Sequence, residues 1–172
     1  MKKAVIAACL AVSATLAMAS CSNTTQPSDN YELAGGVNVD YTFEYPKTWE
    51  KTRDDGMIAV KSTETGANIS VTAFRPTENY ASIEEYLEKY KSSFAETLGN
   101  YSEISLEDVT LDDISAKKIT YTATVMDAEY KFASIVCIRN NIVYTITYTA
   151  TDADFDVHAP TLAHIIQSFD FQ

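Results

Sequence analysis

The side chains best suited to hold a metal ion in this chain are His158, His164 and Cys137. Two ligands on one helix usually lie three or four residues apart, because that spacing places both side chains on the same face. The two histidines are six positions apart, so a helix would direct them to different sides. We therefore expect two surface histidines, and a metal site only if folding brings Cys137 to both of them.

Cys137 could also act as a nucleophile, but its setting favours burial. It lies in an apolar run, residues 132–138, where a free cysteine behaves as a small hydrophobic side chain. A reactive thiolate requires an electropositive and partly open environment. We predict that Cys137 belongs to the core.

Alternate acids at Asp152, Asp154 and Asp156 resemble the beginning of a calcium-binding loop. Such a loop also needs a glycine for its sharp turn and a glutamate at its end, but Val157 and Ala163 stand at those positions. The start of the last helix explains the acids better, because the helix dipole favours negative charge there.

Recognised catalytic motifs are missing from the sequence. It has no Gly-x-Ser-x-Gly nucleophile turn, no His-Glu-x-x-His zinc motif and no glycine-rich phosphate loop. Acids are plentiful, so paired carboxylates for glycoside cleavage stay open, although none lies in a recognisable context. We assign no catalytic, cofactor-binding or metal-binding residue, and we expect no cofactor.

The N-terminus has the features of an export signal. A short basic segment, Met1–Lys3, precedes an uncharged and mostly apolar run over residues 4–20, which is short for a membrane-spanning helix. Residues 16–21 resemble the lipobox of bacterial lipoproteins, in which small residues precede a cysteine that becomes the acylated N-terminus. Met18 stands where that motif prefers leucine. The alternative is an ordinary signal peptide followed by a chance cysteine.

The lipobox resemblance divides the chain into three parts. Residues 1–20 are the predicted lipoprotein signal peptide, residues 21–38 are the lipidated Cys21 and a flexible tether, and residues 39–172 are one folded domain. The tether is predicted because its residues are polar, include proline and glycine, and lack hydrophobic periodicity. The resemblance implies a protein that is exported and lipid-anchored through Cys21 to the outer face of a bacterial membrane.

The net charge excludes one class of partner. Removing the signal takes away two of the 13 basic side chains and none of the 24 acidic ones, so the formal charge changes from −11 to −13. Nucleic acid binding relies on lysine and arginine side chains that neutralise phosphates, so we expect no nucleic acid partner. The same charge opposes electrostatic docking of the whole domain on anionic lipids, which leaves the acyl chains as the attachment.

The clearest predicted element is a helix over residues 83–98. Ser82 and Glu85 form a capping box at its start, and Gly99 stands where a left-handed residue ends many helices. Apolar side chains recur at helical spacing and define one buried stripe: Ile83, Tyr86, Leu87, Tyr90, Phe94 and Leu98.

Alternation of apolar and polar residues predicts strands over residues 39–45, 57–62, 68–75, 101–111, 115–126, 130–138 and 142–149. Asn140 and Asn141 favour a tight hairpin turn, because asparagine tolerates positive φ. A second helix is predicted over residues 159–168, since Pro160 is acceptable in a first helical turn. These elements indicate an α+β fold, with an antiparallel sheet of about seven strands and helices packed on it.

The segment from Phe43 to Trp49 resembles the aromatic-x-Tyr-Pro-x-x-Trp opening of PsbP-like domains. The runs 142–148 and 165–169 fit the same family in the same order, and so does the position of the first helix. The resemblance implies a PsbP-like α/β/α sandwich over most of residues 39–172. We interpret Trp49 as structural, packed on the sheet edge or under a helix, with an exposed recognition anchor as the alternative.

The PsbP-like resemblance implies no single function, because one fold can host many sites. Such domains are extrinsic subunits of photosystem II in plants and cyanobacteria, and a similar fold binds a small GTPase in a nuclear-transport factor. We expect a noncatalytic, lipid-anchored binding or scaffolding domain at the bacterial cell envelope, with a protein partner that the sequence does not identify. The alternatives are an envelope hydrolase whose site is assembled from scattered residues, and a small-ligand binder.

Overall fold

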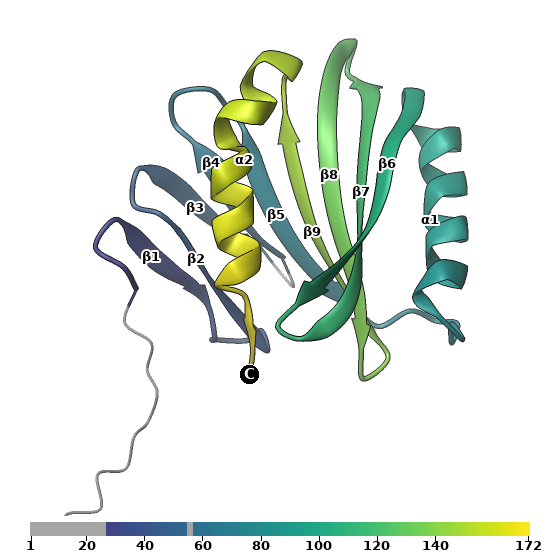
Figure 1. Ribbon diagram of the computed structural model, residues 1–172, viewed down its shortest axis with the longest axis horizontal. Coiled ribbons are helices and arrows are strands. Elements are labelled where there is room, and N and C mark those ends of the chain that lie inside the picture. The colour runs from purple at the N-terminus through teal and green to yellow at the C-terminus, as the bar shows by residue number, and fades with distance from the viewer. Residues whose placement is uncertain (1–26, 55–56) are drawn as a thin grey trace, which may run out of the picture.

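The computed structural model describes residues 27–54 and 57–172, so Cys21 and the predicted signal peptide lie outside the described residues. A seven-stranded antiparallel sheet in the order β3-β4-β5-β9-β8-β7-β6 forms the centre of the domain (Figure 1). In chain order its strands are β3 (Trp49–Asp54), β4 (Met57–Ser62), β5 (Asn68–Phe74), β6 (Gly99–Leu111), β7 (Ile114–Val125), β8 (Ala128–Arg139) and β9 (Ile142–Ala150). Two meanders, β3–β5 and β6–β9, are therefore joined where β5 pairs with β9.

Tight two-residue turns connect the strands of the second meander. Their central residues are left-handed, with φ of 46° and 59° at Asp112–Asp113, 48° and 64° at Met126–Asp127, and 52° and 59° at Asn140–Asn141. Two consecutive positive φ values give a turn whose twist matches that of the flanking strands. The turn predicted at Asn140–Asn141 is thereby confirmed.

Helix α1 (Ile83–Thr97) lies where the sequence predicts it. The Ser82 side chain accepts a hydrogen bond from the Glu85 backbone N–H, as expected for an N-cap. The prediction for Gly99 is wrong, because this residue begins β6 and the left-handed conformation falls on Asn100, with φ of 51°. The chain thus passes from the helix directly into a strand.

Helix α2 (Asp152–Gln167) begins seven residues earlier than position 159, where we predicted its start. Thr151 caps it by accepting a hydrogen bond from the Asp154 N–H. Pro160 consequently lies in the middle of the helix and not in its first turn. Its ring is exposed, so the backbone carbonyl that loses its partner there can be hydrated.

A second, three-stranded sheet packs beside α2 in the order β1-β2-β10, formed by β1 (Tyr31–Gly35), β2 (Tyr41–Pro46) and β10 (Asp170–Phe171). Residues 31–35 pair along their whole length with β2, so the predicted tether over residues 21–38 is wrong for this segment. The strand forms because Ala34 is buried in the core and β2 offers an open edge.

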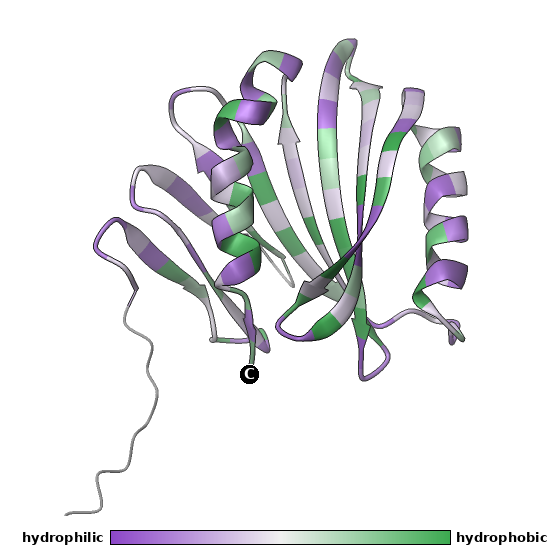
Figure 2. Cartoon of the chain, viewed as in Figure 1, coloured by the Kyte–Doolittle hydropathy of each residue, from purple (hydrophilic) through white to green (hydrophobic). Residues whose placement is uncertain are grey.

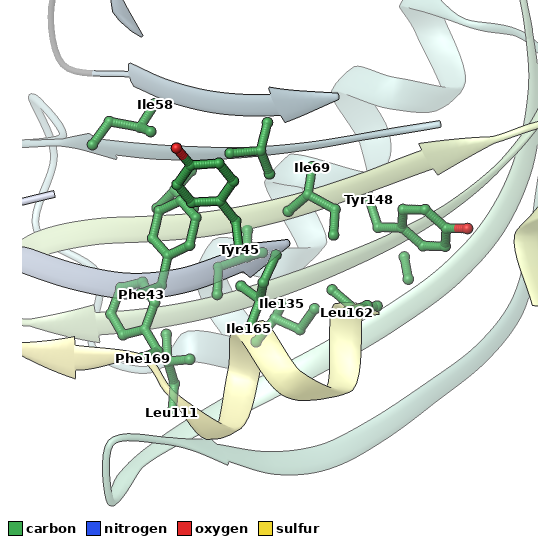
Figure 3. Close-up of a cluster of buried hydrophobic side chains, with 14 of the residues drawn as sticks. Phe43, Tyr45, Ile58, Ile69, Leu111, Ile135, Tyr148, Leu162, Ile165 and Phe169 are labelled. Atoms are coloured by element: carbon green, nitrogen blue, oxygen red, sulfur yellow. The ribbon is translucent and has the colours of Figure 1, made fainter. Parts of the chain in front are cut away.

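The two faces of the main sheet carry separate cores. Neighbouring residues Ile135 and Val136 on β8 point to opposite sides, Ile135 toward α2 and Val136 toward α1. Under α2 and the small sheet, Phe43, Ile135 and Ile165 are among the interlocking side chains (Figure 3). Green, hydrophobic bands alternate with purple and white ones along the strands, as expected for strands whose successive side chains point to opposite faces (Figure 2).

The α+β prediction, an antiparallel sheet with helices packed on it, is confirmed. The sheet is sandwiched between α1 on one face and α2 with the small sheet on the other. In the part of the chain that the structure describes, neither helix is long and apolar enough to cross a membrane.

Candidate functional site

An open pocket of about 460 Å³ lies at one end of the main sheet, where three segments meet. The loop before β2, the end of β5 and the start of β9 line it with Asn38, Val39, Asp40, Ala73, Phe74, Arg75 and Ile142. We name it the Asp40 pocket. Its volume falls within the range of pockets that accept small molecules or single side chains.

A tight loop, closed by a backbone hydrogen bond, precedes Asp40. Gly35, Gly36 and Asn38 are left-handed, with φ of 106°, 79° and 66°. The Gly36 N–H donates to the Tyr41 carbonyl oxygen at 2.9 Å, which closes the loop. A Cβ on Gly35 would lie 2.1 Å from that same oxygen, so glycine is required there.

Asp40 is the centre of a small polar network beside the pocket. The Tyr144 hydroxyl donates to its Oδ2 at 2.5 Å, and Nη1 of Arg139 lies 3.7 Å from the same oxygen. The Arg139 guanidinium also lies 4.8 Å from the centre of the Phe171 ring. Burial, and then the hydrogen bond to Asp40, raise the pKa of Tyr144 to about 12, so this hydroxyl stays a donor at neutral pH.

The rim of the Asp40 pocket exposes apolar surface beside a cation. Phe74 is 46% exposed and Val37, just before the lining residue Asn38, is 68% exposed. Arg75 follows Phe74 and is also exposed. Aromatic and arginine side chains around an apolar centre are enriched where proteins bind one another. This arrangement can bury an apolar side chain of a partner and offer a hydrogen-bonding cation at its edge.

The two histidines lie on α2, where each contacts a different segment. His158 Nε2 is 2.8 Å from Thr65 Oγ1, and its ring meets Trp49 edge-on at 5.2 Å between centroids. His164 Nε2 is 2.8 Å from Glu44 Oε2 on β2. The prediction of simple surface histidines is therefore wrong, because both are half-buried contacts between layers.

Cys137 is fully buried in the core between the sheet and α2, which confirms its predicted place. Burial raises the pKa of its thiol to about 12, and the nearby Arg139 opposes this shift only in part. The thiolate is therefore scarce at neutral pH. Within residues 27–54 and 57–172, no three His, Cys, Asp or Glu side chains are grouped so as to hold a metal ion.

The alternate acids belong to the first turns of α2. Asp152 and Asp154 lie in its first turn, and Asp154 Oδ2 accepts a hydrogen bond from the Thr151 hydroxyl at 2.7 Å. Asp156 is exposed one turn further. This confirms the interpretation of the acids as the start of the last helix.

A second pocket, of about 590 Å³, lies between the start of α1 and the β6–β7 hairpin. Its cation, Lys117, is held between two acids, with Nζ 3.1 Å from Glu84 Oε1 and 2.5 Å from Asp108 Oδ1. The two carboxylates balance the positive charge of Lys117, which links α1 to the β6–β7 hairpin.

The sequence did not predict the residues of the Asp40 network as a site. Asp40, Arg139 and Tyr144 lie on two distant segments and match no short motif. The one available signal is the Gly35–Gly36 pair, which marks a backbone that adopts positive φ just before a strand.

The arrangement of a sheet between helices recurs in solved structures. The solution structure of cyanobacterial PsbP from Synechocystis sp. PCC 6803 matches with a TM-score of 0.65 and 14% identity, over 90% of this chain and 99% of that one. A protein of unknown function from Pseudomonas aeruginosa matches with a TM-score of 0.61 and 16% identity, over 81% of this chain and 95% of that one.

A protein from Bacteroides thetaiotaomicron VPI-5482 matches with a TM-score of 0.61 and 13% identity, over 83% of this chain and 49% of that one. At these identities the similarity shows the fold alone. No curated protein sequence is a significant match.

These structures define the class of the domain as an α/β/α sandwich with the PsbP architecture. The sequence profile of the PsbP-like protein family matches residues 4–171. The chain therefore belongs to the PsbP-like protein family, as the Phe43–Trp49 segment indicated.

Proposed function

We propose that this chain is a noncatalytic, lipid-anchored binding domain at the outer face of a bacterial membrane, and that the Asp40 pocket receives a protein partner. The observation that carries the proposal is the rim of this pocket, where exposed Phe74 adjoins the cation of Arg75, and exposed Val37 directly precedes the lining residue Asn38. Aromatic and arginine side chains are enriched at the centres of protein interfaces.

The chemistry of the pocket favours binding over catalysis. Its carboxylate, Asp40, is already hydrogen-bonded by Tyr144 and close to Arg139, and the pKa of Tyr144 is raised away from neutrality. A general acid or base works best with a pKa near the operating pH. The thiol of Cys137 and the imidazoles of the histidines are engaged in the interior and between layers.

Attachment to the membrane is proposed from the lipobox around Cys21. The expected check is the intact mass of the mature protein, which should show acyl chains on Cys21 and none in Cys21→Ser. An unmodified Cys21, or a retained signal peptide, would exclude the anchor.

A small apolar ligand is a second candidate for the Asp40 pocket. Its volume of about 460 Å³ supports this candidate, because ligand pockets usually measure about 300–1,000 Å³. The two candidates differ in what the exposed rim does. A protein partner would cover Phe74 and Val37, whereas a small ligand would contact mainly the walls.

The test compares two exposed hydrophobic residues on different parts of the surface. Phe74 at the pocket is 46% exposed, and Leu106 on β6 is 44% exposed. Each is changed to aspartate in the full-length protein, and crosslinking in the native membrane is followed by capture. We expect Phe74→Asp to lose the captured partner and Leu106→Asp to retain it. Equal capture by both variants would rule out the Asp40 pocket as the docking site.

A further inference from the structure

Strand β1 fixes the chain to the domain much closer to Cys21 than the sequence suggested. The Tyr31 N–H donates to the Ser28 carbonyl at 2.9 Å, and Lys47 Nζ donates to the Asp29 carbonyl at 2.7 Å. The Tyr31 ring stacks on His164 of α2, with centroids 3.8 Å apart. The domain is therefore held from about Ser28 onward.

The remaining link between lipid and domain is short. Cys21 and Ser28 are seven positions apart, so a fully extended chain spans at most about 25 Å. A domain of this length has a radius of gyration of about 15 Å, so the link is shorter than the domain is wide. The β1 end of the small sheet must then stay close to any membrane that holds the acyl chains.

The surface at this end has the chemistry of a membrane interface. Leu33 on β1 is 46% exposed, and Lys51 Nζ lies 3.5 Å from its carbonyl oxygen. At the other end of β1, Lys47 contacts the chain just before the strand, at the Asp29 carbonyl oxygen. The nearby acid Glu32 accepts a hydrogen bond from the Tyr45 hydroxyl at 2.7 Å.

A shallow pocket lies on the same surface. It measures about 460 Å³ and is lined by Pro27, Asp29, Tyr31, Glu32, Leu33 and Lys47. We call Tyr31, Leu33, Lys47 and Lys51 the anchor face. This face combines one exposed apolar side chain with ammonium groups that contact the backbone before and within β1. Interfacial segments use such a combination to place apolar groups among acyl chains and cations at phosphates.

We propose that the anchor face rests on the phospholipid headgroups of the membrane that carries the acyl chains of Cys21. The inference rests on the proposed lipidation and adds an orientation to it. Lys47 and Lys51 contact phosphates, and Leu33 reaches the headgroup–acyl boundary.

The net charge of the mature chain sets a limit on this contact. A formal charge of −13 opposes binding of the whole domain to anionic lipids. The contact therefore depends on the proximity that the acyl chains impose, through a high effective concentration of headgroups at the anchor face. Protein without acyl chains is expected to stay off the same vesicles.

The experiment uses the full-length acylated protein in vesicles of phosphatidylethanolamine and phosphatidylglycerol, some with a nitroxide on the headgroup. A bimane label is placed at Leu33→Cys or, as the control, at the similarly exposed Leu106→Cys on β6. Cys137 is buried and Cys21 is blocked by its lipid, so the label enters at the new cysteine. We expect loss of fluorescence at position 33 and none at position 106. Equal quenching at both positions overturns the inference.

A matched pair of charge reversals tests the lysines in the Leu33→Cys background. Lys51→Glu should reduce quenching at position 33, while Lys61→Glu, an exposed lysine on the neighbouring strand β4, should leave it unchanged. Unchanged quenching in Lys51→Glu overturns the role of the cation. The intact mass separates the two proposals, because an unmodified Cys21 removes both, whereas an acylated Cys21 without quenching at position 33 removes the orientation alone.

Discussion

At the scale of single residues, histidine and aromatic side chains form the contacts between α2 and segments that are distant in the sequence. His158 and His164 lie on different sides of α2, as their spacing predicted, yet each contacts a partner about 90 residues or more away. Sequence spacing determines the direction of a side chain on its helix. It does not determine which loop or strand arrives opposite, so the contacts with Thr65 and Glu44 could not be predicted.

The burial of Cys137 leads to a prediction about its reactivity. Because burial raises the pKa of its thiol to about 12, little thiolate exists at neutral pH and reagent access is blocked. We expect slow labelling by a disulfide reagent in the native state and fast labelling in denaturant. Met126→Cys, at a position that is 96% exposed, should label rapidly in the native state. Native labelling of Cys137 at the rate of position 126 would contradict its burial.

Trp49 is structural, as predicted, since it is only 8% exposed and packs against His158 of α2. Trp49→Ala should lower the free energy of unfolding by about 3–5 kcal/mol, because truncating a buried aromatic leaves a cavity. Denaturant unfolding measures the change, and Trp49→Phe should cost less. Leu106→Ala, at an exposed site, should leave stability almost unaltered. A Trp49→Ala variant as stable as Leu106→Ala would contradict the structural role and favour the alternative, a recognition anchor.

At the scale of elements, long periodic segments were predictable and short polar ones were not. Helix α1 and strands β4, β5 and β7–β9 show clear apolar patterns and lie where expected. Strand β3 was missed because Trp49–Asp54 is mostly charged, which suits an edge strand but gives no alternation. Helix α2 begins earlier than predicted because Thr151 caps it and because Pro160 lies inside the helix and not at its start.

Strand β1 depends on the glycine turn that returns the chain into β2. Gly35 has φ of 106°, and a Cβ there would meet the Tyr41 carbonyl oxygen at 2.1 Å. Gly35→Ala should therefore separate β1 from β2, with a loss of stability well above the ~1–2 kcal/mol of a left-handed alanine alone.

Gly66→Ala is the matched control for this turn. Gly66 has φ of 80°, but the nearest atom to its Cβ position is Lys61 Cε at 4.0 Å. It should cost only the ~1–2 kcal/mol of left-handed strain. Melting temperatures and amide exchange across residues 31–35 measure the difference. Equal melting temperatures, with β1 still protected in Gly35→Ala, would show that the turn adapts.

At the scale of the whole molecule, the fold class was predictable and the candidate site was not. Hydrophobic periodicity reports which side of an element is covered, and that is enough for a sheet with helices on it. The Asp40 pocket depends on which strand ends meet, and it joins residues 38–40 to residues 73–75 and Ile142. That adjacency arises because β9 returns beside β5, a pairing that no local pattern encodes.

The tyrosine-rich interior makes the whole molecule sensitive to alkaline pH. Burial is the main cause that raises the pKa of Tyr41, Tyr45 and Tyr144 from 10.0 to about 12 in the folded protein. Between these values the native state keeps protons that the unfolded chain has lost. The folded state then binds more protons than the unfolded state, so the free energy of unfolding falls as pH rises. The stability from these groups is complete below about pH 10 and is lost progressively up to about pH 12.

We therefore expect cooperative, base-induced unfolding in this window, in which tyrosinate absorbance and loss of circular dichroism rise together. Ionisation and unfolding coincide because a buried hydroxyl can lose its proton only when the core opens. Tyr144→Phe removes one of the linked groups and should make stability fall less steeply with pH across the same window. Recovery of the native spectrum on return to neutral pH controls for chemical damage. Tyrosinate absorbance that is complete while circular dichroism stays native would show that these tyrosines ionise without unfolding and are accessible to solvent.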